Sequence, residues 1–256
     1  MRLDIFLFQN GFVKSRQRAK CLIEDGNVKV DGKVIQKPSF DVISNEIKIE
    51  VIDDCPYVSR GGLKLEGILK ATGVEVANKV CLDIGASTGG FTHCLLLNGA
   101  KRVYAIDSGT NQLDPLLKND PRVISIENFN ARNLTIEATT EMVDLITIDV
   151  SFISQNLIIP TIQAVLMDDG VFFSLIKPQF EVGKALVGKG GIVKDKKARL
   201  LAVESVLACA CQYGLVCNMF LKSPIQGGDG NIEYLASFSK KGNPVNKEYI
   251  KKIVFE

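Results

Sequence analysis

A glycine-rich turn in the first half of the chain has the residue types of a cofactor site. Asp83 lies in a short apolar segment that leads to Gly85, Gly89 and Gly90, and a second apolar segment begins at Phe91. This order indicates a strand, a tight turn and a helix, the opening unit of a doubly wound sheet. Glycine tolerates positive φ and lets a ligand lie against bare backbone. The turn therefore predicts a cofactor site, with a glycine turn of some other α/β domain as the alternative.

The spacing of the glycines narrows the type of cofactor. A dinucleotide site prefers G-x-G-x-x-G, whereas here no glycine stands between Gly85 and Gly89. The missing glycine argues against a pyrophosphate on this turn. The next apolar segment, 102–106, ends at Asp107. An acid there can accept hydrogen bonds from a ribose diol, or it can simply cap the turn that follows.

The pattern D-x-G-x-x-x-G resembles the first motif of S-adenosylmethionine-dependent methyltransferases. The resemblance implies that the acid and the loop backbone hold the methionine end of S-adenosylmethionine. The cofactor-binding residues that we expect are Asp83, Gly85, Ala86, Ser87, Thr88, Gly89, Gly90, Phe91, Asp107, Asn130 and Asp149.

Four ionisable residues could serve methyl transfer, which needs an aligned nucleophile, loss of its proton and a dry site. Asp149 and Lys177 each end a strand-like segment, Glu233 lies in the last predicted hairpin, and Lys64 lies in the helix before the first strand. We expect these four side chains to converge as catalytic residues at the edge where parallel strands end. For Lys177 and Asp149 the alternative is a structural ion pair, because a charge at a buried strand end is costly unless it is paired.

Alternating strand-like and helix-like segments must position these residues. The predicted fold is α/β, a seven-stranded Rossmann-like methyltransferase domain with a final antiparallel hairpin around residues 227–230, preceded by a small α+β domain. Strands are expected over 80–84, 102–106, 122–126, 144–149, 171–176, 216–221 and 232–238. Helices are expected over 61–72, 90–98, 112–118, 154–166 and 195–213.

The N-terminal segment reads as a compact basic module. A short helix, a second helix over 16–24, a hairpin turning at Asp31-Gly32 and a third strand over 46–52 are predicted. Residues 1–40 carry eight Lys or Arg against four Asp or Glu. Such a surplus suits a phosphate backbone, although a merely solvated basic face is the alternative. We predict domains over 1–56 and 57–244 and a tail of unassigned role over 245–256.

A second basic segment, over 181–197, is rich in Gly and Lys and is expected to be a mobile loop that clamps RNA, with a solvated loop that makes no RNA contact as the alternative. The predicted RNA-binding residues are Arg2, Arg16, Arg18, Lys20, Lys29 and Lys33 in the N-terminal module, and Lys184 and Lys189 in this loop.

Composition excludes several classes of protein. No apolar run approaches the ~18–20 residues that span a bilayer, and the start lacks the features of a signal peptide. The seven cysteines form no C-x-x-C pair, so a disulfide framework is not expected and a reducing, cytoplasmic location is. His93 is the single histidine, which leaves little for a Ser-His-Asp triad or a mixed His/Cys zinc site. We therefore expect neither a metal nor a membrane partner.

The whole chain resembles the TlyA family, in which an S-four RNA-binding domain precedes an FtsJ-like methyltransferase domain. Lys64, Asp149, Lys177 and Glu233 match the Lys-Asp-Lys-Glu tetrad of FtsJ-like ribose 2′-O-methyltransferases. Two departures are Tyr57, where some members have tryptophan, and His93, which replaces an often acidic residue. The other matching motifs are Arg2-Leu3-Asp4, Ser15-Arg16, Val30-Asp31-Gly32, Lys37-Pro38, Tyr57-Val58-Ser59-Arg60-Gly61-Gly62, Ile148-Asp149-Val150-Ser151-Phe152-Ile153-Ser154, Ile176-Lys177-Pro178-Gln179-Phe180-Glu181 and Gly188-Lys189-Gly190-Gly191.

The resemblance implies methylation of a ribose 2′-hydroxyl of cytidine in ribosomal RNA, with rRNA or a ribosomal subunit as partner and the large subunit slightly favoured. Lys177 would take the hydroxyl proton or hold the attacking oxygen. Two other functions stay open: an RNA-binding protein with an inactive methyltransferase half, and a membrane-active haemolysin, a label that many members carry.

Overall fold

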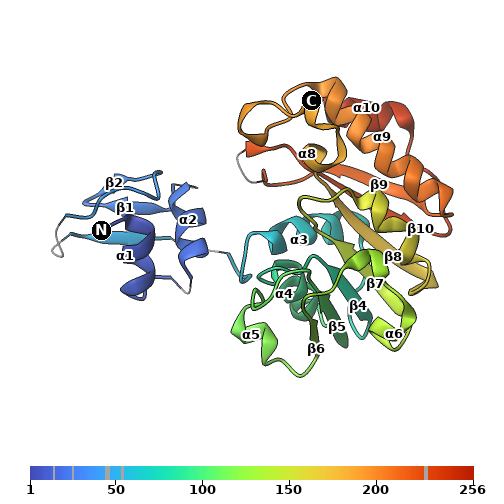
Figure 1. Cartoon of the computed structure of the whole chain (residues 1–256), viewed down its shortest axis with the longest axis horizontal. Helices are drawn as coiled ribbons and strands as arrows, with labels where there is room; N and C mark the ends of the chain where they lie inside the picture. Colours follow the sequence, from blue (N-terminus) through green and yellow to red (C-terminus); the bar gives the residue numbers. More distant parts are fainter. Residues whose placement is uncertain (14, 25, 44–46, 53–54, 228–229) are drawn as a thin grey trace. The chain divides into compact units, whose positions relative to one another are not determined.

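The computed structural model describes residues 1–13, 15–24, 26–43, 47–52, 55–227 and 230–256. This part of the chain clusters into two compact units, Met1–Pro56 and Tyr57–Glu256 (Figure 1). The segment 245–256, expected to be a separate tail, belongs to the second unit. Each unit has its own buried apolar cluster.

The first unit packs two helices on a small antiparallel sheet. Asp31 and Gly32 both have positive φ, as a two-residue turn between antiparallel strands requires. Leu3, Leu7 and Ile23 of the helices are fully buried in its core. The elements are α1 (Leu3–Gln9), α2 (Arg16–Glu24), β1 (Val28–Val30), β2 (Lys33–Val34) and β3 (Ile49–Val51), with β1 between β2 and β3.

The second unit is built on a seven-stranded sheet with the order β6-β5-β4-β7-β8-β10-β9. Strand β10 runs antiparallel to both β8 and β9, while the pairs from β6 to β8 are parallel. This topology confirms the predicted α/β fold and its antiparallel last strand. The strands are β4 (Val80–Ile84), β5 (Arg102–Ile106), β6 (Val123–Ile126), β7 (Val143–Ile148), β8 (Leu166–Ile176), β9 (Val216–Lys222) and β10 (Tyr234–Ser239).

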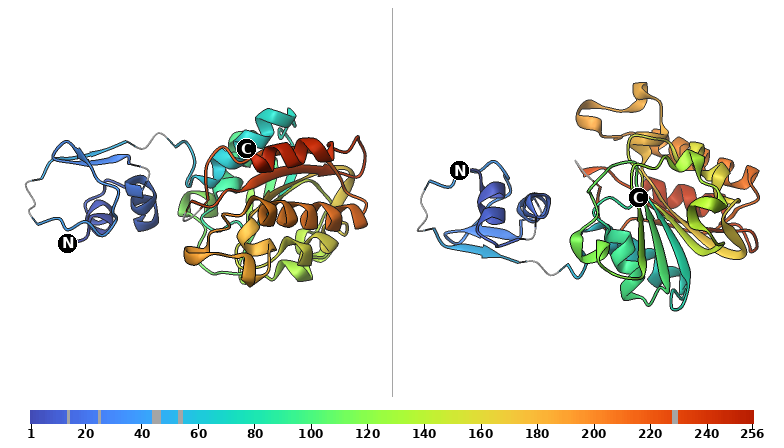
Figure 2. Two further views of the ribbon diagram at one scale, coloured as in Figure 1. Left: turned by 90° about the horizontal axis from the view of Figure 1, so that it is seen from above. Right: turned by 60° about the horizontal axis from the view of Figure 1, so that its bottom comes forward.

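Helices cover both faces of this sheet (Figure 2). Leu82 and Ile84 of β4 point into the main core cluster, which includes residues of α7, α9 and α10, whereas Asp83 points to the face that α4 covers. Alternation along a strand sends neighbouring residues to opposite faces. The helices are α3 (Gly61–Thr72), α4 (Gly90–Leu97), α5 (Pro115–Lys118), α6 (Ile136–Thr139), α7 (Ile159–Ile162), α8 (Pro178–Glu181), α9 (Lys196–Gln212) and α10 (Lys247–Phe255), with 3-10 turns η1 (Ala131–Asn133), η2 (Gln155–Leu157), η3 (Lys184–Leu186) and η4 (Lys189–Gly191).

The predicted helix over 154–166 is wrong. The segment forms η2 and the short helix α7, and β8 already begins at Leu166. Pro160 lies in the first turn of α7, because proline lacks the N–H that a helix interior needs but is tolerated where a helix begins. Pro115 shortens the predicted helix over 112–118 to α5 in the same way.

The segment 245–256, to which the sequence assigned no role, contains helix α10. Its Ile250 and Val254 are buried in the main core, and the helix contacts α9 and β9. Glu233, expected inside the last strand, lies one residue before β10. Residues 228 and 229 of the predicted hairpin lie outside the described residues.

Candidate active site

The turn after β4 passes close to the end of β7. Gly85 has a φ of +84°, and a Cβ atom there would lie 2.4 Å from the carbonyl oxygen of Asp149. The N–H groups of Gly85 and Ala86 donate to the carbonyl of Ile106 at 2.9 and 3.1 Å. Position 85 therefore requires glycine for its conformation and for this close approach.

Replacing Gly85 by alanine is expected to lower the free energy of unfolding by about 1–3 kcal/mol more than Gly99→Ala does. Gly99 is a matched control, since its φ is +85° but a Cβ would come no closer than 3.4 Å to Ala77. Both variants carry the cost of a left-handed alanine, and only the first adds overlap with Asp149. Urea unfolding of both proteins measures the difference, and equal losses would contradict the close-packing argument.

A cavity of about 360 Å³ opens where β4, β5 and β7 end, within the range of roughly 300–1,000 Å³ that is usual for small-molecule sites. Five of the predicted cofactor residues line it: Gly85, Ser87, Asp107, Asn130 and Asp149. Its apolar wall includes Ile106, Phe129, Ala131, Val150 and Ile158, which the sequence patterns did not single out.

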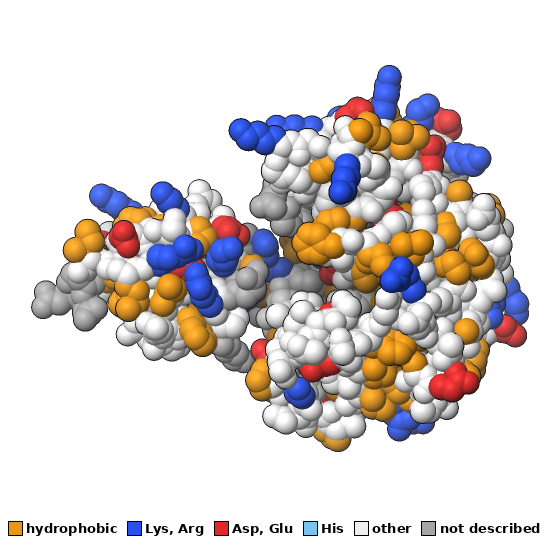
Figure 3. Space-filling model, viewed as in Figure 1, with side chains coloured by type: hydrophobic (Ala, Val, Ile, Leu, Met, Phe, Trp, Pro, Cys, Tyr) orange, Lys and Arg blue, Asp and Glu red, His pale blue; other side chains and the backbone are white. Residues whose placement is uncertain are grey.

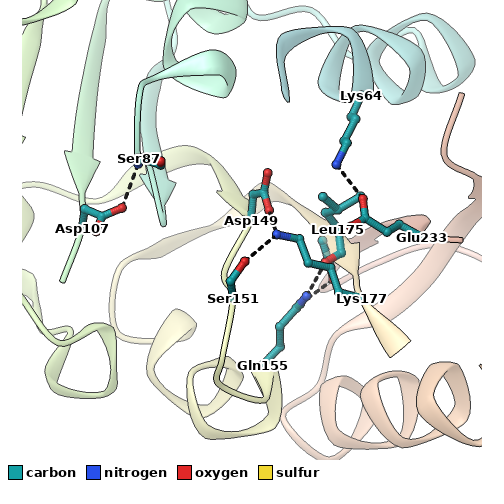
Figure 4. Close-up of polar contacts among 10 residues, drawn as sticks. Lys64, Ser87, Asp107, Asp149, Ser151, Gln155, Leu175, Lys177 and Glu233 are labelled. Carbon is teal, nitrogen blue, oxygen red and sulfur yellow. Dashed lines mark hydrogen bonds and ion pairs between the residues drawn. The ribbon is translucent and has the colours of Figure 1, made fainter. Parts of the chain in front are cut away.

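Asp107 is fixed at the edge of this cavity. Its Oδ2 accepts the backbone N–H of Ser87 at 2.7 Å (Figure 4), and its Oδ1 accepts that of Gly109 at 2.7 Å. A carboxylate oxygen has more than one acceptor site, so both oxygens keep capacity for further donors. This carboxylate is thus placed to accept from a diol without first being reoriented.

Asp83 does not line the cavity, which differs from the prediction that this residue contacts the cofactor. Its side chain is fully buried, and its oxygens accept hydrogen bonds from Thr92 at 2.7 Å and Thr147 at 2.9 Å. Burial raises the pKa of this carboxyl to about 6, although the two threonines oppose the shift. Asp83 ties β4 to α4 and β7 behind the cavity.

Five further predicted cofactor residues are also absent from the lining of the cavity. In the described part of the chain they shape the turn and the start of α4 and are not among the residues that line the cavity. They are Ala86, Thr88, Gly89, Gly90 and Phe91.

We expect Asp83→Asn to remove part of the pH dependence of stability. A raised pKa means that the folded protein binds this proton more tightly than the unfolded chain does. The stabilisation is full below the ordinary value of about 3.9 and is lost as the pH rises through about 6. Two pKa units correspond to about 3 kcal/mol. Between about pH 4 and pH 7, the free energy of unfolding of Asp83→Asn should therefore rise by up to that amount relative to that of the wild type.

Urea unfolding of the wild type and Asp83→Asn at several pH values measures this gain. Asp169→Asn, on an exposed part of β8, is the matched control and should follow the wild type at every pH. A constant difference between the Asp83 variant and the wild type would contradict the raised pKa.

Lys177 and Asp149 meet where β8 and β7 end. The Lys177 Nζ lies 2.5 Å from Asp149 Oδ1 and donates a hydrogen bond to Ser151 Oγ at 3.0 Å (Figure 4). The contact with Asp149 is an ion pair. Because Asp149 also lines the cavity, the lysine amine lies beside that space.

Lys64 and Glu233 form a second, deeper pair. Lys64 Nζ donates to Glu233 Oε2 at 2.6 Å, and the side chains are 11% and 2% exposed. Tyr234, the first residue of β10, pairs with Ile176, the last residue of β8. Glu233, just before β10, and Lys177, just after β8, therefore lie at the same end of these adjacent strands. Figure 4 shows all four predicted catalytic side chains in one neighbourhood.

Phe152 is a feature of the site that sequence reasoning did not identify as functional. It is 92% exposed, has a φ of +65° and lines the cavity next to Ser151. Its ring lies 5.1 Å from that of Phe180. The sequence carries no signal for it, because exposure and backbone conformation of one loop residue follow from tertiary contacts.

The basic residues of the first unit do not all face solvent freely. Arg2 and Arg16 each lie 2.9 Å from the buried carboxylate of Asp4. Burial works to raise the pKa of Asp4, but these guanidinium groups outweigh it and hold the pKa below its ordinary value. Arg18, expected beside them on the surface, is buried, because α2 turns this position toward the unit. The exposed parts of Arg2 and Arg16 remain available to an anion.

Other cations of this unit are accessible. Lys20 and Lys33 are exposed, while Lys29 lies 3.8 Å from Glu50. Lys and Arg side chains gather on the visible face of the unit (Figure 3). The unit therefore keeps a basic surface, with fewer free charges than the residue count suggested.

The Gly- and Lys-rich segment has more structure than the predicted mobile loop. It contains η3 and η4, and Lys184 and Lys189 are exposed. The buried Asn231 anchors it, since its Oδ1 accepts from the N–H of Val193 at 3.2 Å and its Nδ2 donates to the carbonyl of Gly191 at 3.0 Å.

Two expectations concerned a membrane and a metal ion. Within the described ranges, no helix has the length and apolar composition needed to cross a bilayer. Over the same residues, no group of three or more His, Cys, Asp or Glu is arranged to hold a metal ion.

The doubly wound sheet with its antiparallel last strand, and the cavity where β4, β5 and β7 end, define a methyltransferase fold. The chain belongs to the FtsJ-like methyltransferase family, whose model matches residues 57–240. A model of the S4 domain matches residues 1–47.

Named relatives agree with this assignment. The chain is 43% identical over 235 residues to the 16S/23S rRNA (cytidine-2′-O)-methyltransferase TlyA of Mycobacterium tuberculosis, covering 91% of this chain and 87% of that protein. It is 44% identical to Hemolysin A of Brachyspira hyodysenteriae, covering 93% and 99%. A solved Streptococcus thermophilus protein that carries a hemolysin name is 41% identical, with a TM-score of 0.80 and coverage of 100% and 94%. These matches confirm the predicted resemblance to TlyA.

Proposed function

We propose that this protein transfers a methyl group from S-adenosylmethionine to a ribose 2′-hydroxyl of cytidine in ribosomal RNA. The observation that carries the proposal is the Lys177–Asp149 ion pair beside the cavity, with Lys64 and Glu233 next to it. The FtsJ-like family and the printed activity of the TlyA relative support the same reaction.

The cavity suits S-adenosylmethionine in chemistry and size. Asp107 offers oriented acceptor oxygens for a ribose diol, and the backbone at Gly85 leaves room for close approach. Asp149 supplies a carboxylate on the cavity wall, whose charge would suit a sulfonium. When bound, the cofactor supplies an electrophilic methyl group.

We assign to Lys177 the contact with the nucleophile, the ribose 2′-hydroxyl. As the ammonium that pairs with Asp149 and donates to Ser151, Lys177 would hold the 2′-oxygen by a hydrogen bond as it attacks. Only after losing its own proton would the neutral amine accept the proton of the 2′-hydroxyl. Asp149 and Ser151 would orient the amine. Lys64 and Glu233 carry opposite charges, so their ion pair adds no net charge beside the site.

The surface of both units favours RNA as the substrate class. Lys20 and Lys33 in the first unit and Lys184 and Lys189 in the second are exposed cations that suit phosphates. An exposed aromatic ring, Phe152, stands beside the catalytic pair, as stacking of an unpaired base requires. We therefore propose an unpaired or extruded nucleotide as target, in rRNA or a ribosomal subunit, with the large subunit favoured. Such an enzyme would act in the cytoplasm.

The test is methyl transfer by the purified protein. Isotope-labelled S-adenosylmethionine is incubated with rRNA or with isolated subunits, and 2′-O-methylcytidine is mapped by mass spectrometry. Labelled 2′-O-methylcytidine is the expected product. RNA binding without label transfer, and without heat of S-adenosylmethionine binding, would instead favour an RNA-binding protein with an inactive half. Dye leakage from liposomes would favour the membrane-active alternative.

A further inference from the structure

The loop that carries Asp149 is tied a second time to the segment that carries Lys177. This 149–154 loop follows β7, and behind the catalytic pair it meets the last residue of α8, Glu181. The Glu181 carboxylate accepts Ser154 Oγ at 2.5 Å and the backbone N–H of Gln155 at 3.0 Å. Lys177 and Glu181 are thus the two ends of one short segment that contacts both ends of the loop.

Gln155 adds a third tie to the same strand end. Its side chain is 1% exposed. Its Nε2 donates to the carbonyl of Leu175 at 2.6 Å (Figure 4), and its Oε1 accepts Ser174 Oγ at 2.5 Å. Leu175 and Ser174 lie just before Lys177 on β8, so the loop is fastened on both sides of the lysine.

Glu181 is a costly choice for a purely structural residue. It is half-buried, and within the described ranges no cation lowers the pKa of its carboxyl. Burial raises the pKa of its carboxyl, and the hydrogen bonds from Gln155 and Ser154 only partly offset this. A desolvated carboxylate without a cation is unfavourable unless its acceptors are used. One oxygen of Glu181 accepts from Ser154 at the end of the 149–154 loop, and the other accepts from Gln155, the next residue.

The loop itself needs such support. Phe152, at its middle, has a φ of +65°, a conformation that persists for a bulky residue only when the surroundings over-determine it. During catalysis Lys177 must also exchange a contact with Asp149 or Ser151 for one with substrate. The contact of Lys177 with the loop is then weakened, whereas the hydrogen bonds of Glu181 and Gln155 remain.

We propose that Glu181 is a positioning residue, which together with Gln155 keeps the 149–154 loop in register with Lys177 while the lysine acts on substrate. This inference rests on the proposed catalytic role of Lys177. It extends the Lys-Asp-Lys-Glu set to a fifth charged residue that does not touch the reacting atoms.

A comparison of Glu181→Ala with Glu181→Gln separates the effect of the hydrogen bonds of Glu181 from the effect of its negative charge. Glutamine can accept the Gln155 N–H with its carbonyl and donate to Ser154 Oγ with its amide, whereas alanine can do neither. Ser154→Ala removes one contact and leaves the carboxylate in place. Glu204→Ala, on an exposed position of α9, is the matched control.

The measurement is the single-turnover rate of 2′-O-methylation at saturating S-adenosylmethionine and rRNA, with cofactor affinity from calorimetry and a melting curve for each variant. We expect Glu181→Ala to lower the rate about 10–100-fold, because small misplacements of reacting groups cost this much, with cofactor Kd changed by less than about threefold. Glu181→Gln should recover the rate to within about threefold of the wild type, and Ser154→Ala should lose several-fold.

Three outcomes would overturn the inference. They are a wild-type rate for Glu181→Ala, an equal loss of activity in the alanine and glutamine variants, and a fall of rate and cofactor affinity in the same proportion, as for a general loss of structure. If Glu181→Ala does not fold, Ser154→Ala and Glu181→Gln still decide. A fully active Lys177→Ala would instead refute the proposed function, so the two failures are distinguishable.

Discussion

Lys177→Ala is expected to lower the rate of 2′-O-methylation by about 10²–10⁴-fold, the usual contribution of a positioned proton acceptor. The amine that lies 2.5 Å from Asp149 and donates to Ser151 is lost, and nothing then takes the proton or holds the attacking oxygen. Single-turnover transfer of a labelled methyl group to rRNA, with both substrates saturating, measures the loss. Cofactor affinity should change little, because Lys177 does not line the cavity wall that Gly85, Ser87 and Asp107 form.

Lys101→Ala is the matched control for this variant. Lys101 is an exposed lysine of the second unit, placed before β5 at the opposite end of the sheet from the cavity. Its removal should leave the rate unchanged. A Lys177 variant that methylates as fast as the wild type would refute the proposed reaction for this site.

Glu233→Ala is expected to destabilise the second unit by about 3–5 kcal/mol, as the loss of one partner of a buried ion pair does. Lys64, whose side chain is 11% exposed, would keep its charge without its partner at 2.6 Å. Urea unfolding followed by circular dichroism measures the change. Glu66→Ala is the matched control on the same helix, since its pair with Lys70 is largely exposed and such pairs contribute about 0–1 kcal/mol.

A double replacement separates stability from catalysis at this pair. Lys64→Met with Glu233→Met removes both charges and keeps apolar volume, which is often neutral for stability. We expect the double variant to unfold near the wild-type urea concentration but to methylate at least about tenfold more slowly. If it is both stable and fully active, the pair is structural, and the catalytic set reduces to Lys177 and Asp149.

The parallel part of the sheet was predictable because its strands are buried on both faces and read as short apolar runs. The segments 80–84 and 102–106 coincide with β4 and β5. The same rule placed Asp149 and Lys177 at one edge, since strand ends in such sheets meet there. Glu233 was assigned to the last antiparallel hairpin. The helix over 154–166 failed because apolar periodicity outweighed the effect of Pro160 in the prediction, whereas in the protein the proline begins a new helix.

Side-chain roles were less predictable than strand ends. Asp83 looked like a cofactor ligand by its place in the motif, but alternation along β4 turns it toward Thr92 and away from the cavity. Arg18 looked like a surface cation, yet it is buried. Both outcomes depend on which neighbour packs against a given face, and residue spacing alone does not contain that information. The motif that contains Glu181 gives this residue no role, whereas its hydrogen bonds with Ser154 and Gln155 do.

The position of β10 has a consequence during synthesis of the chain. It is the last strand to be made, yet it lies inside the sheet, between β8 and β9. Until residues 234–239 emerge, β8 and β9 each present a row of unpaired backbone groups, and such edges promote aggregation. Chains interrupted before β10 should therefore be handled as misfolded material, while the first unit, whose three strands pair among themselves within residues 28–51, can form before the rest is translated.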